Sequence, residues 1–173
     1  MPDATGLELI AAEVRDKLGE DAVVGTKYAH ERAVLEISPA RVHDVVAYLK
    51  EGADEPFDSL MSVHGCDYLP AEPRLAVHYV LLSMERVERL NVRTRMGADD
   101  PVVPTVTDLF ATADFQEREV FDMFGVRFEG HPDLRRILMP EDYEGYPQRR
   151  DFPIGGEPVI FTYNEHQLPR WYD

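Results

Sequence analysis

The sequence predicts a two-layer α+β domain in the order helix, two strands, helix, three strands, followed by a further helix and a long extended C-terminal segment. Two kinds of hydrophobic spacing carry this prediction. Apolar residues recur at helical intervals in the N-terminal part, whereas residues 89–96 alternate between two faces as in a strand. With 173 residues and 44% hydrophobic content, the chain is long enough to build one core of this kind.

The first helix is predicted over residues 5–18 from its start, its apolar stripe and its end. Thr5 and Glu8 have the spacing of a capping box, in which both side chains bind free backbone N–H groups of the first turn. Gly19 is typical of the residue that ends a helix. The stripe between these signals consists of Leu7, Ile10, Ala11, Val14 and Leu18.

Two short strands, residues 21–25 and 33–37, and a second helix are expected next. Ser38 is suited to cap this helix, and Pro39 is suited to its first turn. The helix should end before Gly52. Its buried stripe is predicted to be Val42, Val45, Val46 and Leu49.

Three further strands are predicted over residues 60–67, 75–82 and 89–96, which are rich in Val, Leu and Tyr. The last strand alternates most clearly, so we expect one of its faces on the core and the other toward water or a partner. The two faces are Leu90, Val92, Thr94 and Met96 on one side and Arg89, Asn91, Arg93 and Arg95 on the other. The α+β domain should span residues 1–100.

One more helix is predicted after Pro101, capped by Asp114 and closed by Gly125. Helical spacing places Glu117 within its apolar sector, where a carboxylate must be hydrogen-bonded or paired. Two interpretations remain open: Glu117 completes a capping box with Asp114, or it pairs with an arginine of the pair Arg135 and Arg136. The apolar side of this helix should consist of Val120, Phe121 and Phe124, and the opposite side of Arg118, Glu119 and Asp122.

Residues 126–173 are rich in Pro, Gly and charge, without the period of a helix or a strand. A loop-like run of this length is uncommon inside an isolated domain, so we expect it to wrap on a neighbour. We divide the chain after residue 100 into a region with the last helix and the signature loop, residues 101–153, and an extended tail, residues 154–173. The tail is expected to fill pockets of a partner with its aromatic residues, although residues 159–163 could instead add a strand to the sheet. These aromatic residues are Phe161, Tyr163, Trp171 and Tyr172.

Composition excludes several classes of function. A net charge of −15 and a pI near 4.7 disfavour binding to nucleic acid and to anionic membrane surfaces. No apolar stretch approaches the roughly 20 residues that cross a bilayer, and residues 1–13 lack a secretory signal, so a cytoplasmic location is expected. The single cysteine, Cys66, provides neither a disulfide nor the thiolates of an iron–sulfur cluster.

Two groups of residues suggest metal chemistry only weakly. Carboxylates next to a histidine, at Asp133, Glu141 and Asp142 beside His131, could ligate a divalent ion and would then suggest a free-standing metal-dependent hydrolase. Satisfied turns and salt bridges are the favoured interpretation, because prolines make this backbone irregular. His64 and Cys66 share one face of a strand but lack a second pair of ligands, so we interpret them as core or packing residues.

Residues 117–153 read EREVFDMFGVRFEGHPDLRRILMPEDYEGYPQRRDFP. The pattern Glu-Arg-Glu, two residues, Asp, two apolar residues, six residues, His, three residues, Arg, one residue, two aliphatics is met at every position from Glu117 to Leu138. This segment closely resembles the signature of the C subunits of proton-translocating NADH:quinone oxidoreductase, respiratory complex I. Its continuation also matches, at Pro140, Asp142, Gly145, Pro147, Arg149 and Asp151. It departs from the family at Tyr143, Gln148 and Arg150, where Trp, Leu and Lys are common.

The resemblance implies a structural subunit without redox groups, in the peripheral arm on the cytoplasmic side of the cell membrane. It would pack against the D and B subunits, of which D holds the quinone site, with the I subunit to consider as a third neighbour. Flavin, iron–sulfur clusters and quinone would belong to the partners, and the isolated chain would catalyse nothing. A related membrane-bound hydrogenase, or a ferredoxin- or F420-linked quinone oxidoreductase, remains the alternative machine.

The interface with these partners is expected in the signature segment and the tail. The two arginine pairs, 135–136 and 149–150, are expected to make contacts both within the chain and, predominantly, with the partner. The expected interface residues are Glu117, Arg118, Glu119, Asp122, Phe124, Gly125, Phe128, Gly130, His131, Pro132, Asp133, Leu134, Arg135, Arg136, Leu138, Pro140, Asp142, Tyr143, Gly145, Pro147, Arg149, Arg150, Asp151, Pro153, Phe161, Tyr163, Trp171 and Tyr172.

Overall fold

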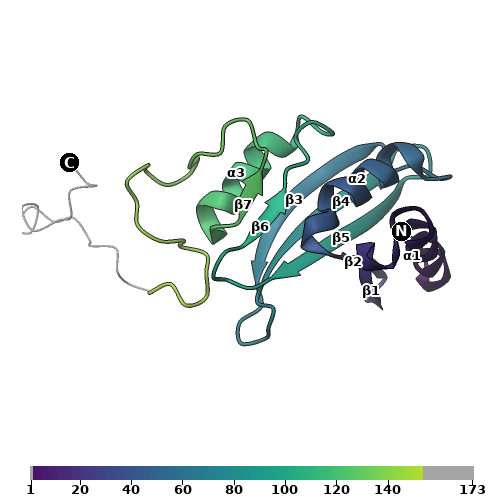
Figure 1. The fold of residues 1–173 in the computed structure, drawn as a ribbon, viewed down its shortest axis with the longest axis horizontal. Coiled ribbons are helices and arrows are strands. Elements are labelled where there is room, and N and C mark those ends of the chain that lie inside the picture. The colour runs from purple at the N-terminus through teal and green to yellow at the C-terminus, as the bar shows by residue number, and fades with distance from the viewer. Residues whose placement is uncertain (1, 154–173) are drawn as a thin grey trace, which may run out of the picture.

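The computed structural model describes residues 2–153. Their secondary structure forms one five-stranded sheet, a two-stranded sheet and three α-helices (Figure 1). The α+β class predicted from the sequence is confirmed. The expected tail contacts and the alternative strand at residues 159–163 lie outside the described residues.

The main sheet has the strand order β1-β2-β5-β4-β3. Its strands are β1 (Val23–Ala29), β2 (Arg32–Ile37), β3 (Ser59–Asp67), β4 (Leu75–Ser83) and β5 (Glu88–Met96). Neighbours pair antiparallel except for β2 and β5, which are parallel. All five predicted strands are therefore present.

The first strand is later and longer than the predicted 21–25. A 3-10 turn, Glu20–Ala22, precedes it, and a tight turn with positive φ at His30 and Glu31 joins it to β2. Pairing with β2 extends β1 through Lys27 and Tyr28, which lie in the polar stretch between the two predicted strands. Cross-strand hydrogen bonds, not side-chain polarity, set this boundary.

The first helix, α1 (Ala4–Leu18), packs on the sheet with Leu7, Ala11 and Val14 buried. Its N-cap is Asp3, whose Oδ1 accepts the Gly6 N–H at 2.7 Å, so the predicted capping box at Thr5 is wrong. Asp3 lies one residue before the helix, where an N-cap side chain can reach the free N–H groups.

The second helix begins with a 3-10 turn, Pro39–Arg41, continues as α2 (Val42–Ala47) and ends in a π-helical turn, Tyr48–Gly52. Its predicted stripe is buried as expected, at Val42, Val45, Val46 and Leu49. Ser38 occupies the N-cap position and Pro39 the first turn, as predicted, but the Ser38 side chain makes no capping hydrogen bond.

The core face of β5 consists of the four residues that alternation predicted, and each is buried: Leu90, Val92, Thr94 and Met96. In β4 the odd-numbered residues 75–81 share this core face. The even-numbered face of β4, which includes His78, therefore belongs to the opposite side of the sheet.

The third helix, α3 (Ala113–Phe124), packs against β3 at the far end of the sheet from α1 (Figure 1). Gly65 of β3 permits this contact, because a Cβ there would lie 2.4 Å from the Phe124 ring. The helix ends as predicted at Gly125, which has φ +74° and donates its N–H to the Phe121 carbonyl. Its N-cap is Thr112 instead of the predicted Asp114, and it makes no side-chain cap bond.

Two short strands next to α3 were not predicted. β6 (Val102–Pro104) pairs in parallel with β7 (Arg127–Glu129), so part of the expected loop-like run 126–173 belongs to a sheet. Three residues are too few to show a strand period, so the pairing was invisible in the sequence. No helix within residues 2–153 has the length and apolar character needed to cross a membrane.

Candidate functional site

The signature loop is the part of the signature segment that follows β7, residues 130–153. The Asp122 carboxylate on α3 is the centre of the hydrogen bonds that hold this loop. It projects from α3 and is buried. Its Oδ2 accepts the backbone N–H groups of three consecutive loop residues, Ile137 at 3.0 Å, Leu138 at 2.7 Å and Met139 at 2.9 Å. Its Oδ1 accepts a hydrogen bond from Arg136 at 2.7 Å. Burial by itself would raise the pKa of Asp122, but these donors together hold it below its usual range.

This geometry corrects the helical-wheel prediction, which placed Asp122 on the outer side of the helix. The loop folds back over that side and supplies the donors that a buried carboxylate needs. Arg136 also links Asp122 to a later part of the loop, because its Nη2 donates a hydrogen bond to the Gly145 carbonyl at 3.0 Å. Its guanidinium also lies 5.8 Å from the Tyr143 ring centroid and 5.5 Å from that of Tyr146.

Glu117 is also fully buried, but neither interpretation from the sequence is right. Its Oε1 accepts the backbone N–H of Val106 at 2.9 Å, and its Oε2 accepts the hydroxyl of Thr105. The carboxyl group thus ties α3 to the segment that follows β6. Burial raises its pKa to about 7, although both hydrogen bonds oppose the shift.

The raised pKa of Glu117 predicts a pH-dependent stability. The protonated form is favoured in the fold, so the contribution is complete below the ordinary pKa of 4.5 and is lost as pH rises through about 7. Between about pH 5 and about pH 8 the wild-type chain should lose roughly 2 kcal/mol more unfolding free energy than Glu117→Gln. Chemical denaturation of both proteins at the two pH values measures this. Parallel pH profiles for the two proteins would contradict it.

A second polar cluster fixes the far end of the signature loop to the sheet. Arg74 lies between Asp67 of β3 and Asp151, donating from Nε to Asp67 at 3.0 Å and from Nη1 to Asp151 at 2.8 Å. Asp67 also accepts the backbone N–H of Arg150 at 2.9 Å. Sequence reasoning missed Asp67 and Arg74, because 77 residues separate Arg74 from Asp151 and no local pattern connects them.

The arginines of the segment all have partners within the chain. Arg118 donates to the carbonyls of Arg135 and Arg136, each at 3.2 Å. Arg149 donates to the Phe124 carbonyl at 2.6 Å, and Arg150 to that of Leu69. Many of the contacts expected for the two arginine pairs are therefore made within the chain. Arg135, bound at 2.9 Å to the exposed Asp133, has a side chain that is 61% exposed.

The histidine proposed as a metal ligand is occupied by backbone groups. His131 Nδ1 accepts the Asp133 N–H at 3.1 Å, and Nε2 lies 3.3 Å from the Asp114 carbonyl. Glu141 and Asp142 are exposed. Within residues 2–153, the side chains grouped for metal binding lie elsewhere, at His64, Cys66 and His78. The favoured interpretation of the His131 group, satisfied turns, agrees with this geometry.

The predicted interface residues divide by exposure. Glu117, Asp122, Phe124 and Phe128 are buried and therefore support the loop from inside. Half-buried positions are Arg118, Gly125, His131, Leu134, Arg136, Tyr143, Pro147 and Arg149. Exposed positions are Glu119, Gly130, Pro132, Asp133, Arg135, Leu138, Pro140, Asp142, Gly145, Arg150, Asp151 and Pro153. The tail residues Phe161, Tyr163, Trp171 and Tyr172 lie outside the described part of the chain.

The same fold occurs in solved structures. The trypsin-resistant fragment 1–134 of Nqo5 has a TM-score of 0.60 at 35% identity, covering 74% of this chain and 98% of the fragment. A chain of the membrane-bound sulfane sulfur reductase, an archaeal respiratory membrane complex, has a TM-score of 0.67 at 28% identity, covering 85% of each chain. The fold thus defines a class of α+β chain, one example of which occurs in an archaeal respiratory membrane complex.

The chain belongs to the family described as respiratory-chain NADH dehydrogenase, 30 Kd subunit, whose model matches residues 35–158. One relative, the C subunit of the NADH-quinone oxidoreductase of Roseiflexus sp. (strain RS-1), is 39% identical over 168 residues, which is 97% of this chain and 94% of the relative. The family resemblance that residues 117–153 indicated is confirmed.

Proposed function

We propose that the chain is a structural subunit, without a redox centre, of the peripheral arm of a proton-translocating NADH:quinone oxidoreductase. It would pack against the D and B subunits, of which D holds the quinone site, with the I subunit nearby, on the cytoplasmic side of the cell membrane. Electron transfer from NADH to quinone would use the flavin and iron–sulfur clusters of other subunits of the assembly. Family membership supports the assembly, and the signature loop supports the mode of contact.

The observation that carries the contact proposal is a loop fixed from inside that exposes apolar side chains outside. Asp122 binds the N–H groups of Ile137 and Leu138, yet their side chains remain exposed, at 37% and 59%. Phe115, on α3, is also exposed. A loop that is already ordered loses little conformational entropy on binding, which favours affinity. Exposed apolar residues on such a loop are suited to pockets of a partner.

A second candidate is the equivalent subunit of a related membrane-bound machine. The TM-score of 0.67 with a chain of the sulfane sulfur reductase favours keeping this alternative. Affinity purification from native membranes distinguishes the two. Co-purification of NADH-binding and iron–sulfur subunits supports the NADH:quinone oxidoreductase, whereas a complex without an NADH-binding subunit supports the related machine.

Leu138→Asp tests the contact surface. We expect it to lower the yield of assembled membrane complex at least tenfold, about 1.4 kcal/mol of binding free energy, without changing the melting temperature of the isolated chain. Leu9→Asp is the matched control, because Leu9 is 67% exposed on α1 at the opposite end of the sheet. Equal complex yields from the two variants would refute the loop as the interface.

A further inference from the structure

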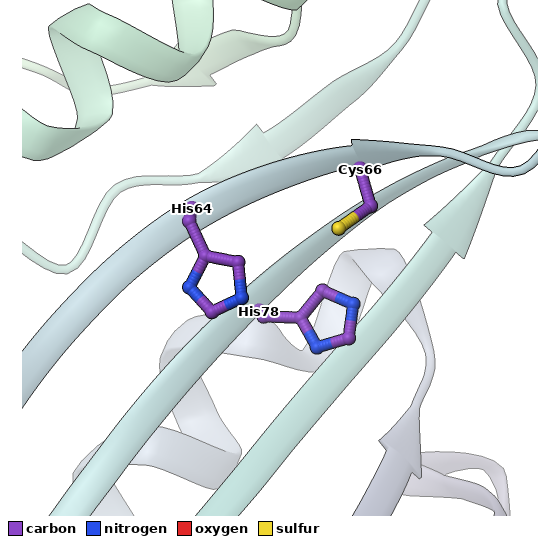
Figure 2. Close-up of side chains that lie close together, drawn as sticks. All are labelled: His64, Cys66 and His78. Carbon is purple, nitrogen blue, oxygen red and sulfur yellow. The ribbon is translucent and has the colours of Figure 1, made fainter.

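Three side chains with metal-binding atoms meet on the face of the sheet opposite the core. His64 and Cys66 lie on β3 and His78 on β4, and Figure 2 shows them converging on one side of the strands. One ligand atom from each, an imidazole nitrogen or the thiol sulfur, lies within 4.8 Å of the others. The group lies beside the signature segment, because His64 lines a small cavity with Glu119, Phe124 and Gln148, but none of the three residues belongs to the proposed contact surface around Leu138.

The strand register creates this group. His64 and His78 are direct partners across the antiparallel pair β3–β4, and their rings stack with centroids 4.9 Å apart. Cys66 follows His64 by two residues, so both project from the same face of β3. The sequence showed only His64 and Cys66 as neighbours. Pairing of the strands supplies the third ligand from 14 residues away.

We propose that His64, Cys66 and His78 bind one zinc ion, with a fourth coordination position open to water. Two imidazole nitrogens and one thiolate are a ligand set that Zn²⁺ prefers, and three protein ligands with an open position are a known arrangement. Zn²⁺ undergoes no redox change, so the expectation of a chain without a redox centre is unaffected.

The protonation states of the two histidines suit a metal. Burial lowers the pKa of His78 to about 4 and lowers that of His64, so both rings are neutral near pH 7 with lone pairs to donate. Asn91 Oδ1 lies 3.1 Å from His78 Nδ1 and can accept a hydrogen bond from the Nδ1–H, which leaves the lone pair on Nε2. The Tyr68 hydroxyl, 3.1 Å from Nε2, would give way to the ion.

The remaining ligand must lose a proton and the rings must move slightly. Burial raises the pKa of the Cys66 thiol, so zinc binding should release its proton to solvent. Bond lengths of about 2.0–2.3 Å require the ligand atoms to lie closer together than they do without an ion. His64 is exposed, and apart from stacking on His78 its ring makes a long 3.4 Å contact with the Ser62 hydroxyl, so the ring can rotate toward the ion.

One nearby charge opposes a cation. Arg93, on β5, lies near enough to influence the pKa of both Cys66 and His78. Its guanidinium, however, forms an ion pair with Glu36 of β2. The carboxylate offsets the positive charge, and the thiolate of Cys66 adds a negative charge at the site itself.

Titration of the metal-free full-length chain with Co²⁺ and then Zn²⁺ tests the site. We expect saturation at one equivalent, with the near-ultraviolet charge-transfer absorption of a cobalt–thiolate bond, and displacement by Zn²⁺. Cys66→Ser should abolish that absorption, and His78→Gln should weaken binding by about tenfold or more. His43→Gln is the matched control, because His43 lies on α2, bound to Asp108, and should leave binding unchanged.

His64→Gln keeps the test decisive if a buried variant fails to fold, since His64 is exposed. It should weaken Co²⁺ binding as His78→Gln does and abolish the rise in melting temperature that Zn²⁺ gives the wild-type chain. Absence of saturable binding, a cobalt spectrum that Cys66→Ser leaves intact, or equal losses in His43→Gln would each overturn the proposal. None of these outcomes bears on assembly with the respiratory partners.

Discussion

Replacing Asp122 with alanine is expected to lower the free energy of unfolding by about 3 to 5 kcal/mol. The variant leaves the Arg136 guanidinium without its carboxylate and the N–H groups of residues 137–139 without an acceptor, at a position that is fully buried. Unsatisfied buried donors carry their full desolvation cost. Chemical denaturation measures the loss, and limited proteolysis should show earlier cleavage of the loop after Leu134.

Asp100→Ala is the control for this measurement. Asp100 pairs with Arg127 at 3.2 Å, but both side chains are largely exposed, so the expected loss is below about 1 kcal/mol. Asp122→Asn should fall between the two, because an amide retains one oxygen acceptor but loses the charge that attracts Arg136. A loss in Asp122→Ala no greater than in Asp100→Ala would contradict the role of this carboxylate.

Asp67→Ala is expected to cost about 3 kcal/mol, at the lower end for a buried ion pair because Arg74 would retain Asp151. The Asp67 side chain is 1% exposed and accepts hydrogen bonds from Arg74 and from the N–H groups of Leu69 and Arg150. The same denaturation series, with Asp100→Ala again as reference, measures the loss.

Acid should reveal the same interaction. The hydrogen bond from Arg74 holds the pKa of Asp67 well below its ordinary 3.8, so the stabilisation is present above that value and is lost as pH falls toward the folded-state pKa. Asp67→Ala should therefore flatten the acid limb of the stability profile. An acid limb as steep in the variant as in the wild-type chain would rule out this assignment.

Helix and strand periods were sufficient to predict most elements of the main domain. The stripe of α1 and the two faces of β5 were predicted residue by residue, because an element that is buried on one side carries apolar residues at regular intervals along its sequence. The boundaries of the elements were predicted less accurately. Asp3 caps α1 through one side-chain hydrogen bond and β1 is extended by its pairing with β2, and hydrophobic periodicity records neither.

The site followed the opposite pattern. The sequence of residues 117–153 was sufficient to identify the family. The predicted contacts of Glu117 and the predicted outward position of Asp122 were wrong. Helical spacing reports which side of α3 is apolar, whereas the chain that covers the other side comes from residues 135–139. A carboxylate on a polar face becomes an interior anchor once a later loop folds over it.

The sequence by itself determined the α+β class, the order of the main elements and the family, since each is written in local spacing or in a contiguous motif. Only the tertiary structure decided which polar groups meet. Arg74 joins Asp151, β6 pairs with β7, and His78 joins His64 and Cys66 through the register of β3 and β4. These contacts join residues that are far apart in the sequence and that no helical or strand period connects. They form only when strand pairing and the fold of the backbone bring the residues together.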